Sequence, residues 1–341
     1  MSDLRICVVG CGRAGMVHAR NFARVVPGAR LVGLADKDET LRGERAAELG
    51  VEAAEEAAFF CDGKADAAVI ATPTRFHAEV AIAAMEAGLH VLCEKPMAMT
   101  PSECERMAQA AESAGVIFQV GFMRRFDAGF CEVAERLEGG EIGRSVSIRS
   151  LTYGPSIPKP WMYDIGSSNG PLAEVNSHDI DTLFWYANSE AEEVFAVAGN
   201  YRCDDARESH PDFYDNVTMT VRFANGAQGL VQGAQGVRYG YDARCEVLGE
   251  SGLLTVGALP DGSVRSHTPA GRTNRIVSSW RDLFREAYVA EDVDFVDCIR
   301  SGRAPRAGAK EGLQALRVVL AGNRSIRERR PVRLEDIQRE N

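Results

Sequence analysis

A glycine run between an apolar segment and a helical pattern constrains the fold of this chain more than any other feature. Leu4–Val9 is a short apolar segment, and Gly10-Cys-Gly12-Arg-Ala-Gly15 follows it directly. Residues Ala14–Val25 then carry apolar side chains at helical spacing. In a strand–turn–helix unit, the first glycine permits the tight turn, the second lets a pyrophosphate approach the backbone and the third lets helix pack on strand. The run therefore predicts a dinucleotide site.

The same alternation of apolar segments and helical patterns continues through the first 123 residues. Helical patterns cover Phe76–Ala87 and Ser102–Ala114. Four further apolar segments alternate with such patterns: Arg30–Ala35, Asp66–Ala71, His90–Cys93 and Ile117–Val120. Continuous apolar strands separated by helices are typical of a parallel sheet that is covered on both faces. We therefore predict an α/β fold that begins with an NAD-binding Rossmann domain, a doubly wound parallel sheet, over residues 1–123.

The pattern changes after Phe122. A helical segment, Phe130–Leu137, precedes a series of strand patterns with no helix between most of them, and Asn225-Gly226 is a hairpin signal. Two helical patterns, Arg281–Ile299 and Glu311–Ile326, end the chain. The expected strands are Val146–Thr152, Val194–Gly199, Val217–Phe223, Gln228–Val237 and Arg244–Leu248. We predict a C-terminal α+β domain over residues 124–341 with a large, mostly antiparallel sheet, for substrate binding and oligomerisation.

Composition excludes several classes of function. The net charge of −10 gives no basic surplus to neutralise nucleic acid or an anionic membrane. No stretch reaches the roughly 20 apolar residues of a membrane helix, and the apolar run at the N-terminus is too short for a signal peptide. The nine cysteines contain no Cys-x-x-Cys pair and the six histidines show no metal-ligand spacing. We expect a cytoplasmic protein without a metal.

Asp36 closes the second apolar segment, about 20 residues beyond the glycine run. A carboxylate at this place accepts hydrogen bonds from the adenine-ribose hydroxyls and repels a 2′-phosphate, which favours NAD. Lys37 follows Asp36 directly and Arg13 lies in the glycine run, and a cation beside the carboxylate could tolerate the 2′-phosphate, so NADP stays a less favoured alternative. A helix cap is the other interpretation of Asp36.

Two later loops follow strands of the same sheet and should reach the same ligand edge. Thr72 and Pro73 follow one strand and would line the nicotinamide side, whereas His77, at a helix start, has either a cofactor or a packing role. Glu94-Lys95-Pro96 ends the next strand. An ammonium there can stabilise an alkoxide or relay a proton. The Lys95-Pro96 bond can be cis or trans.

Glu174 and His178 form a third candidate group. They are four residues apart, so on one helical turn they would share a face. A carboxylate beside an imidazole orients the ring and raises its basicity, as a general base requires. An ordinary surface pair is the alternative.

Together these segments resemble the glucose-fructose oxidoreductase, inositol dehydrogenase and rhizopine-catabolism family (Gfo/Idh/MocA), and most of all its inositol 2-dehydrogenase branch. The resemblance covers essentially the whole chain. Its most specific parts are Gly10–Gly15, Glu94-Lys95-Pro96, Gly121-Phe-Met-Arg-Arg-Phe-Asp127, His178-Asp-Ile-Asp181, Gly240-Tyr-Asp-Ala-Arg244 and Tyr288.

The resemblance implies NAD as cofactor, a polyol or sugar as substrate, a homodimer or homotetramer, and a catalytic group of Lys95, Glu174 and His178. Residue 174 is glutamate where the family has aspartate, so its carboxylate either reaches the imidazole or substrate or points elsewhere. Implied cofactor contacts are Gly10, Gly12, Arg13, Ala14, Gly15, Asp36, Lys37, Thr72, Pro73, His77, Glu94 and Lys95. Implied substrate contacts are Lys95, Arg124, Trp161, Asp164, Glu174, Asn176, His178, Tyr241 and Tyr288.

The expected activity is NAD-dependent oxidation of a secondary hydroxyl on a cyclic polyol. One alternative keeps NAD tightly bound and uses a transient keto-sugar for glycoside cleavage or epimerisation, without net NADH. A less favoured alternative is a non-catalytic NAD-binding protein, which would need neither Lys95 nor His178.

Overall fold

The structure is a computed structural model that describes residues 2–61, 63–257, 261–268 and 271–338, with the backbone alone for 261–268, 271–276 and 338. The chain forms two compact units. Unit 1 comprises Met1–Phe126 and Glu286–Leu316, and unit 2 comprises Asp127–Arg285 and Arg317–Asn341.

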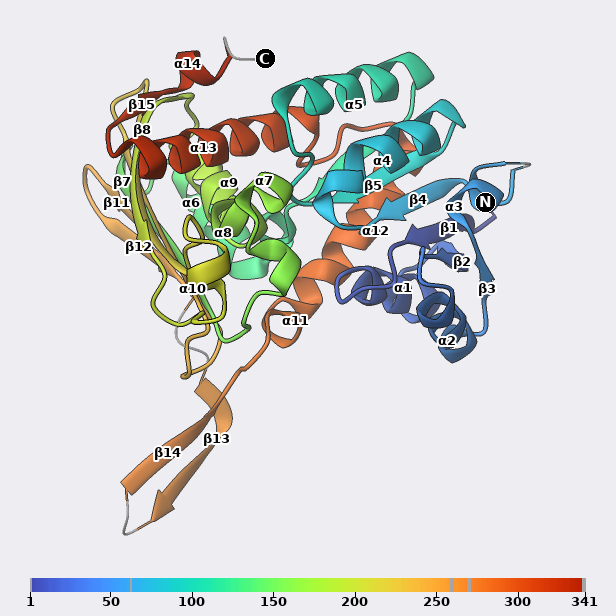
Figure 1. Cartoon of the computed structure of the whole chain (residues 1–341), viewed down its shortest axis with the longest axis horizontal. Coiled ribbons are helices and arrows are strands. Elements are labelled where there is room, and N and C mark those ends of the chain that lie inside the picture. The colour runs from blue at the N-terminus through green and yellow to red at the C-terminus, as the bar shows by residue number, and fades with distance from the viewer. Residues whose placement is uncertain (1, 62, 258–260, 269–270, 339–341) are drawn as a thin grey trace. The chain divides into compact units, whose positions relative to one another are not determined.

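Unit 1 contains the expected parallel sheet. Its strands are ordered β3-β2-β1-β4-β5-β6, and every pair is parallel. Figure 1 shows α4 and α5 over one face of this sheet and α1 and α2 over the other. The strands are β1 (Leu4–Val9), β2 (Ala29–Ala35), β3 (Glu52–Ala54), β4 (Ala67–Ile70), β5 (His90–Glu94) and β6 (Phe118–Gly121). The helices are α1 (Gly15–Arg24), α2 (Glu39–Leu49), α3 (Glu56–Phe60), α4 (His77–Glu86), α5 (Pro101–Ala114) and α12 (Arg285–Ser301), with short 3-10 turns η1 (Thr74–Phe76) and η2 (Met123–Phe126).

Local signals explain where these helices begin and end. Thr100 and Glu103 form a reciprocal capping box at the start of α5, and Gly115 ends that helix in the left-handed conformation. Asp38 caps α2 by accepting the N–H of Leu41, and Gly50 ends it.

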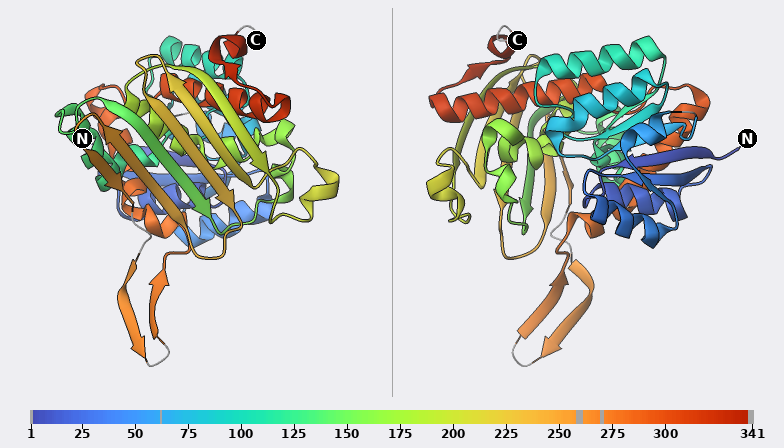
Figure 2. Two further views of the ribbon diagram at one scale, coloured as in Figure 1. Left: turned by 90° about the vertical axis from the view of Figure 1, so that its left-hand side faces the viewer. Right: turned by 45° about the vertical axis from the view of Figure 1, so that its right-hand side comes forward.

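Unit 2 contains a seven-stranded sheet in the order β12-β11-β7-β10-β9-β8-β15. The β7–β10 pair is parallel and the other pairs are antiparallel, which confirms a mostly antiparallel sheet. Figure 2 shows its strands side by side. Asn225 and Gly226 lie in the loop that joins β9 to β10, as predicted. The strands are β7 (Ser145–Gly154), β8 (Ala191–Gly199), β9 (Asn216–Phe223), β10 (Gln228–Gln235), β11 (Asp242–Gly249), β12 (Leu253–Val256) and β15 (Val332–Arg333).

The remaining elements of unit 2 are mostly short helices. Besides them, β13 (Asp261–Thr268) and β14 (Gly271–Ile276) pair as a separate two-stranded sheet. The helices are α6 (Ala128–Glu138), η3 (Pro160–Met162), α7 (Ile165–Ser168), α8 (Gly170–Glu174), α9 (Ser177–Ala187), α10 (Ala206–Ser209), α11 (Trp280–Leu283) and α14 (Leu334–Gln338). Helix α13 (Ala309–Glu328) begins in unit 1 and belongs to unit 2 from Arg317 onwards. Among the described residues, none of the helices is long and apolar enough to cross a membrane.

The division of the chain differs from the expected boundary at residue 123. The segment Glu286–Leu316 belongs with unit 1 rather than with the C-terminal domain. Phe295 and Val296 of α12 explain this, because they are buried in one apolar cluster with Val8 and Leu92 of the parallel sheet. The helix expected over Arg281–Ile299 is also two helices, α11 and α12.

Candidate functional site

The glycine run forms the turn between β1 and α1. Gly10 has φ +102°, and a Cβ atom there would lie 2.4 Å from the carbonyl oxygen of Ala71. A Cβ atom at Gly15 would lie 1.9 Å from the carbonyl oxygen of Gly10. Packing inside the protein therefore requires both glycines.

Gly12 differs from its neighbours because a Cβ atom there would meet none of the described atoms within 4 Å. The open space next to its backbone fits a bound group. Helix α1 begins beside it with no side-chain cap at Ala14 and no acidic residue in its first turn. The N–H groups at such a helix start, with the helix dipole, favour an anion. The turn fits the pyrophosphate of a dinucleotide.

Asp36 follows β2 and is fixed next to the glycine run. Its Oδ2 accepts the N–H of Cys11 at 2.7 Å, and its Oδ1 accepts the N–H of Asp38 at 2.9 Å. The predicted cation Lys37 lies over the ring of Phe76, 4.4 Å from the centroid. Arg42, which the sequence reasoning missed, donates to the carbonyl of Asp36 at 3.0 Å. The only signal for Arg42 in the sequence was its place six residues after Asp36, in the segment that forms α2.

The loops after β4 and β5 are tied together by His77. Its ring is buried; Nδ1 lies 2.7 Å from the carbonyl oxygen of Pro96, and Nε2 lies 2.8 Å from that of Thr72. Burial lowers the pKa of His77, even though both main-chain bonds favour its protonated form. Both ring nitrogens thus contact the protein, in line with the packing alternative. Thr72 and Pro73 lie in the first of the two loops.

Lys95 lies directly after β5, is half-buried and joins Pro96 through a cis peptide bond. The preceding Glu94 is buried, and its Oε2 accepts the N–H of Lys95 at 3.1 Å. Its Oε1 lies 3.3 Å from Nε2 of His18, a residue of α1 that the sequence reasoning missed. The Glu94 carboxylate thus contacts the protein, and the expected cofactor contact of Glu94 stays a prediction.

Two predicted substrate contacts also belong to unit 1. Arg124 is buried in η2, and Tyr288 is buried in α12. The Tyr288 ring meets the His18 ring edge-on, with 5.4 Å between centroids. Tyr288 therefore lies in the unit that contains Lys95, whereas the sequence had assigned it to the C-terminal domain.

In unit 2 the expected helical turn from Glu174 to His178 is broken. Helix α8 ends at Glu174, and α9 begins at Ser177 after Asn176. Glu174 and His178 therefore lie on two successive helices, and their pairing stays a prediction. Asn176 lies at the junction, and its side-chain amide donates to Asp179 in the first turn of α9 at 2.8 Å. Glu174 is half-buried and His178 is buried.

Asn176, a predicted substrate contact, has a buried side chain in unit 2, and its contact with substrate stays a prediction. Its amide faces Gly233 of β10, where a Cβ atom would lie 2.1 Å from the Asn176 Oδ1. Asp179, which accepts its amide, also accepts the hydroxyl of Ser150 on β7 at 2.6 Å. These contacts fix the start of α9 on the sheet.

Tyr241 is another predicted substrate contact. Its side chain is buried, and its ring meets the Phe284 ring edge-on, with 6.5 Å between the centroids.

Trp161 and Asp164 lie in the segment before α7. Trp161 is 36% exposed, which leaves its ring accessible. Asp164 caps α7, with Oδ1 accepting the N–H of Gly166 at 2.9 Å and Oδ2 accepting the hydroxyl of Ser167 at 2.5 Å. A helix cap is thus the visible role of Asp164.

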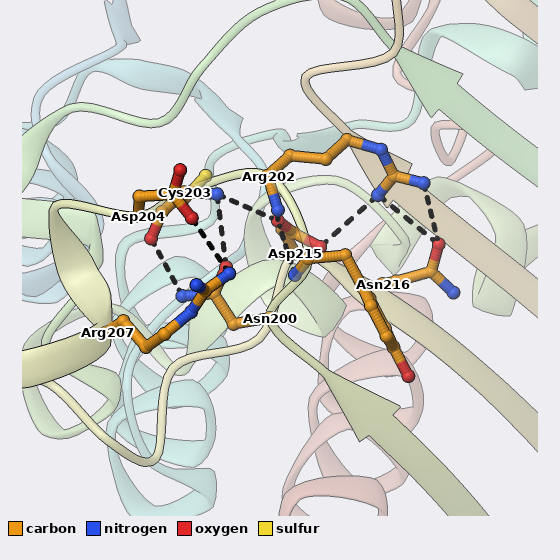
Figure 3. A network of polar contacts seen from close by, with 8 residues as sticks. Asn200, Arg202, Cys203, Asp204, Arg207, Asp215 and Asn216 are labelled. Atoms are coloured by element: carbon orange, nitrogen blue, oxygen red, sulfur yellow. Dashed lines mark hydrogen bonds and ion pairs between the residues drawn. The ribbon is translucent and has the colours of Figure 1, made fainter.

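The connection between β8 and β9 packs against the segment that contains Trp161 and Asp164. Tyr163 packs in a small apolar cluster with Cys203, Ala206 and Phe213, and its hydroxyl donates to Asp205 at 2.9 Å. The connection is held by Asp215, whose buried carboxylate accepts the main-chain N–H groups of Arg202 and Cys203 (Figure 3). It also accepts the main-chain N–H of Tyr201.

Among the described residues, no three metal-ligating side chains gather as a metal site. The open glycine turn with its uncapped helix start and the Asp36 carboxylate define a dinucleotide-binding protein of the Rossmann class.

Comparison with protein families places the chain within this class. Residues 4–122 match the family "Oxidoreductase family, NAD-binding Rossmann fold", and residues 130–255 match the "GFO/IDH/MocA C-terminal domain". The chain belongs to the Gfo/Idh/MocA family of NAD-binding oxidoreductases, which confirms the resemblance seen in its motifs.

Three similar proteins show how far the likeness extends. Myo-inositol 2-dehydrogenase of Thermotoga maritima is 32% identical, across 98% of this chain and 99% of that protein. The NAD(+)-dependent scyllo-inositol 2-dehydrogenase of Bacillus subtilis is also 32% identical, across 98% and 97%. The crystal structure of a myo-inositol dehydrogenase from Corynebacterium glutamicum superposes with a TM-score of 0.87 at 28% identity, across 97% of this chain and 99% of that one.

Proposed function

We propose that this protein oxidises a secondary hydroxyl of a cyclic polyol of the inositol type, with NAD as the hydride acceptor. The observation that carries the proposal is full-length likeness to inositol 2-dehydrogenases in a chain that keeps the open Gly12 turn, Asp36 and a lysine directly after β5. A non-catalytic NAD-binding protein would need no lysine at that place.

The residues of unit 1 are suited to hold NAD and to stabilise charge. The α1 start would bind the pyrophosphate, and Asp36 would accept the ribose hydroxyls. Bound NAD supplies the acceptor for hydride. The Lys95 ammonium would stabilise the alkoxide that forms as the hydroxyl loses its proton.

The residues of unit 2 are suited to proton transfer and recognition. His178 would take the hydroxyl proton, and Glu174 would orient His178 or bind a neighbouring hydroxyl. Trp161, with its exposed ring, would stack on the apolar face of the polyol ring. The second candidate is a redox-neutral reaction through a transient keto-sugar, which would use the same NAD site with Lys95 and His178.

A panel of inositols, pyranoses and glycosides tests the function when NADH and product are measured together. We expect at least one inositol to give NADH and an inosose in equal amounts. Glycoside cleavage or epimerisation without net NADH would identify the second candidate. Failure of every polyol to give either product would contradict both proposals.

Two substitutions test the cofactor site separately. Asp36→Ala should weaken NAD and improve the relative use of NADP, because the carboxylate that repels a 2′-phosphate is lost. Gly12→Ala should weaken NAD binding with little change in folding, because its Cβ would meet only the bound group. Gly10→Ala is the contrasting variant and should lower stability itself. An unchanged NAD/NADP preference in Asp36→Ala would contradict the assigned role of Asp36.

We also propose that two or more copies of the chain associate through the seven-stranded sheet. On β8, the exposed Phe195 and Val197 alternate with the buried Val194 and Ala196, so one face carries apolar side chains in solvent. Leu248 of β11 is exposed as well. Val197→Glu should shift the molar mass in light scattering from dimer or tetramer towards monomer.

The cytoplasmic location of the protein stays a prediction from the sequence.

A further inference from the structure

Unit 1 contains a group of buried ionisable side chains to which the proposed reaction gives no role. His18 of α1, Glu94 of β5, and Glu291 and Asp292 of α12 are each at most 4% exposed. Buried charges are costly unless they are paired and hydrogen-bonded, so the pairing of each group shows what it does.

His18 is held between two carboxylates. Its Nδ1 lies 2.6 Å from Oδ1 of Asp292, and its Nε2 lies 3.3 Å from Oε1 of Glu94. A carboxylate oxygen accepts hydrogen bonds, so both ring nitrogens donate and the ring is an imidazolium. Burial of the ring opposes this charge, but Asp292 and Glu94 outweigh it and raise the pKa of His18 well above its ordinary value. Asn21 fixes the second oxygen of Asp292, to which its amide donates at 2.8 Å.

Glu94 connects this group to Lys95. One oxygen of its carboxylate accepts from His18, and the other accepts the main-chain N–H of Lys95. The carboxylate also lies against Gly121 of β6, where a Cβ atom would be 3.4 Å from it. A continuous set of hydrogen bonds thus runs from Asp292 of α12 through His18 and Glu94 to the backbone of Lys95.

We propose that His18 is a positioning residue for Lys95. Through Glu94 it fixes the main chain from which the Lys95 ammonium extends, and Asp292 in turn fixes the His18 ring. The inference rests on the proposed role of Lys95 in polyol oxidation. The positioning role requires that Nε2 of His18, the ring nitrogen that faces Glu94, donates a hydrogen bond. The Glu94-Lys95-Pro96 turn by itself does not show this requirement.

Two nearly isosteric substitutions separate the two bonds of His18. In His18→Asn the amide nitrogen takes about the place of Nδ1, so the bond to Asp292 is kept and the bond to Glu94 is lost. In His18→Gln the amide nitrogen takes about the place of Nε2, so the bond to Glu94 is kept. We expect kcat to fall about 10- to 100-fold in His18→Asn, as for a displacement of roughly 1 Å in a reacting group, and clearly less in His18→Gln. KM for NAD should change little in either.

Removal of the imidazolium leaves buried negative charge, so His18→Asn is expected to lose stability as well. The double variant His18→Asn with Asp292→Asn removes one negative charge too and should regain thermal stability. Its kcat should stay low, because the bond to Glu94 is still missing. Recovery of kcat together with stability, or equal kcat in His18→Asn and His18→Gln, would overturn the proposal. His90→Asn is the matched control, because His90 lies at the other end of β5 and accepts the N–H of Ile117 at 2.9 Å.

A second measurement needs no substrate and so separates this proposal from the proposed function. The rate at which an acylating reagent modifies Lys95 can be followed by mass spectrometry in the folded enzyme. We expect His18→Asn to change that rate while His90→Asn leaves it as in the wild type. A wild-type enzyme that oxidises no polyol would refute the function alone, whereas an unchanged labelling rate in His18→Asn would refute the positioning role.

Discussion

The residues proposed to do chemistry are held in different ways in the two units. In unit 1, the Glu94-Lys95-Pro96 turn is fixed by ionised and titratable side chains in the core, among them His18 and His77. In unit 2, the segment from Trp161 to His178 is fixed mostly by main-chain hydrogen bonds, helix caps and a small apolar cluster.

We expect the two regions to tolerate amino-acid substitutions to different degrees. Removing one partner of a buried ion pair costs about 3–5 kcal/mol, whereas a typical hydrogen bond contributes only about 0.5–1.5 kcal/mol. The geometry around Lys95 should therefore be rigid in the native protein and sensitive to the loss of one partner, such as His18. The segment around Trp161 can shift at lower cost, which suits a surface that selects among polyols.

The largest expected effects test whether both regions take part in the chemistry. Lys95→Ala and His178→Ala should each lower kcat by about 10²-fold or more, the scale for loss of a positioned acid or base, with NAD binding kept. Turnover on the true substrate and NAD affinity by fluorescence are the measurements. Near wild-type turnover in one of the two variants would show that its residue does no chemistry. The statement that both units supply reacting groups would then be wrong.

A smaller effect is expected when the support of the second region is weakened. Asp215→Asn keeps the shape of the side chain but removes the charge that accepts the N–H groups of residues 201–203. Hydrogen bonds to charged groups contribute about 1.5–3 kcal/mol, so the free energy of unfolding should fall by about that amount. Because Tyr163 packs on this connection, KM for the polyol should rise more than KM for NAD.

Asp212→Asn serves as the control, because Asp212 is exposed in the same connection. It should leave both stability and KM close to the wild type. Equal changes in the two KM values of Asp215→Asn would show that the connection supports the whole fold rather than the Trp161 segment.

The sequence predicted most of the fold because its signals are local. Continuous apolar runs and glycines at fixed spacing determined the parallel sheet of unit 1, and alternation with Asn225-Gly226 determined the β9–β10 hairpin. The β3 strand was missed because Glu52–Ala54 is short and polar at its start. Segment Glu286–Leu316 was misplaced because its packing on β1 and β5 is a long-range contact.

The candidate site could likewise be predicted only where its signals are local in the sequence. Gly10, Gly12, Gly15 and Asp36 could be found because their chemistry follows from one continuous motif. His18 and Asp292 are 274 positions apart, and no periodicity relates them. The break between Glu174 and His178 was missed because a spacing of four fits a helix, while the end of α8 at Glu174 and the start of α9 at Ser177 are visible only in three dimensions.

The smallest expected effect on activity comes with a test of stability against pH, which contrasts a buried carboxyl of unit 1 with an exposed one of unit 2. Burial raises the pKa of Glu291 well above its ordinary value of 4.5, so the folded protein holds the proton that the unfolded chain releases. Stability should therefore fall as pH rises above about 4.5. Glu291→Gln cannot lose this proton, so it should unfold at higher denaturant concentration than the wild type at pH 7, with the gain vanishing near pH 4.5.

The opposite sign is expected at Glu250. Hydrogen bonds from Arg144 lower the pKa of Glu250, so its contribution is present at neutral pH and disappears as pH falls. Glu250→Gln should therefore be slightly less stable than the wild type at pH 7, since the pair is exposed, and equal to it in acid. Urea unfolding of both variants at several pH values measures the contrast. Curves for Glu291→Gln that run parallel to the wild type would mean that Glu291 is ionised in the fold, and the core of unit 1 would then carry more negative charge around His18 than its neutral form implies.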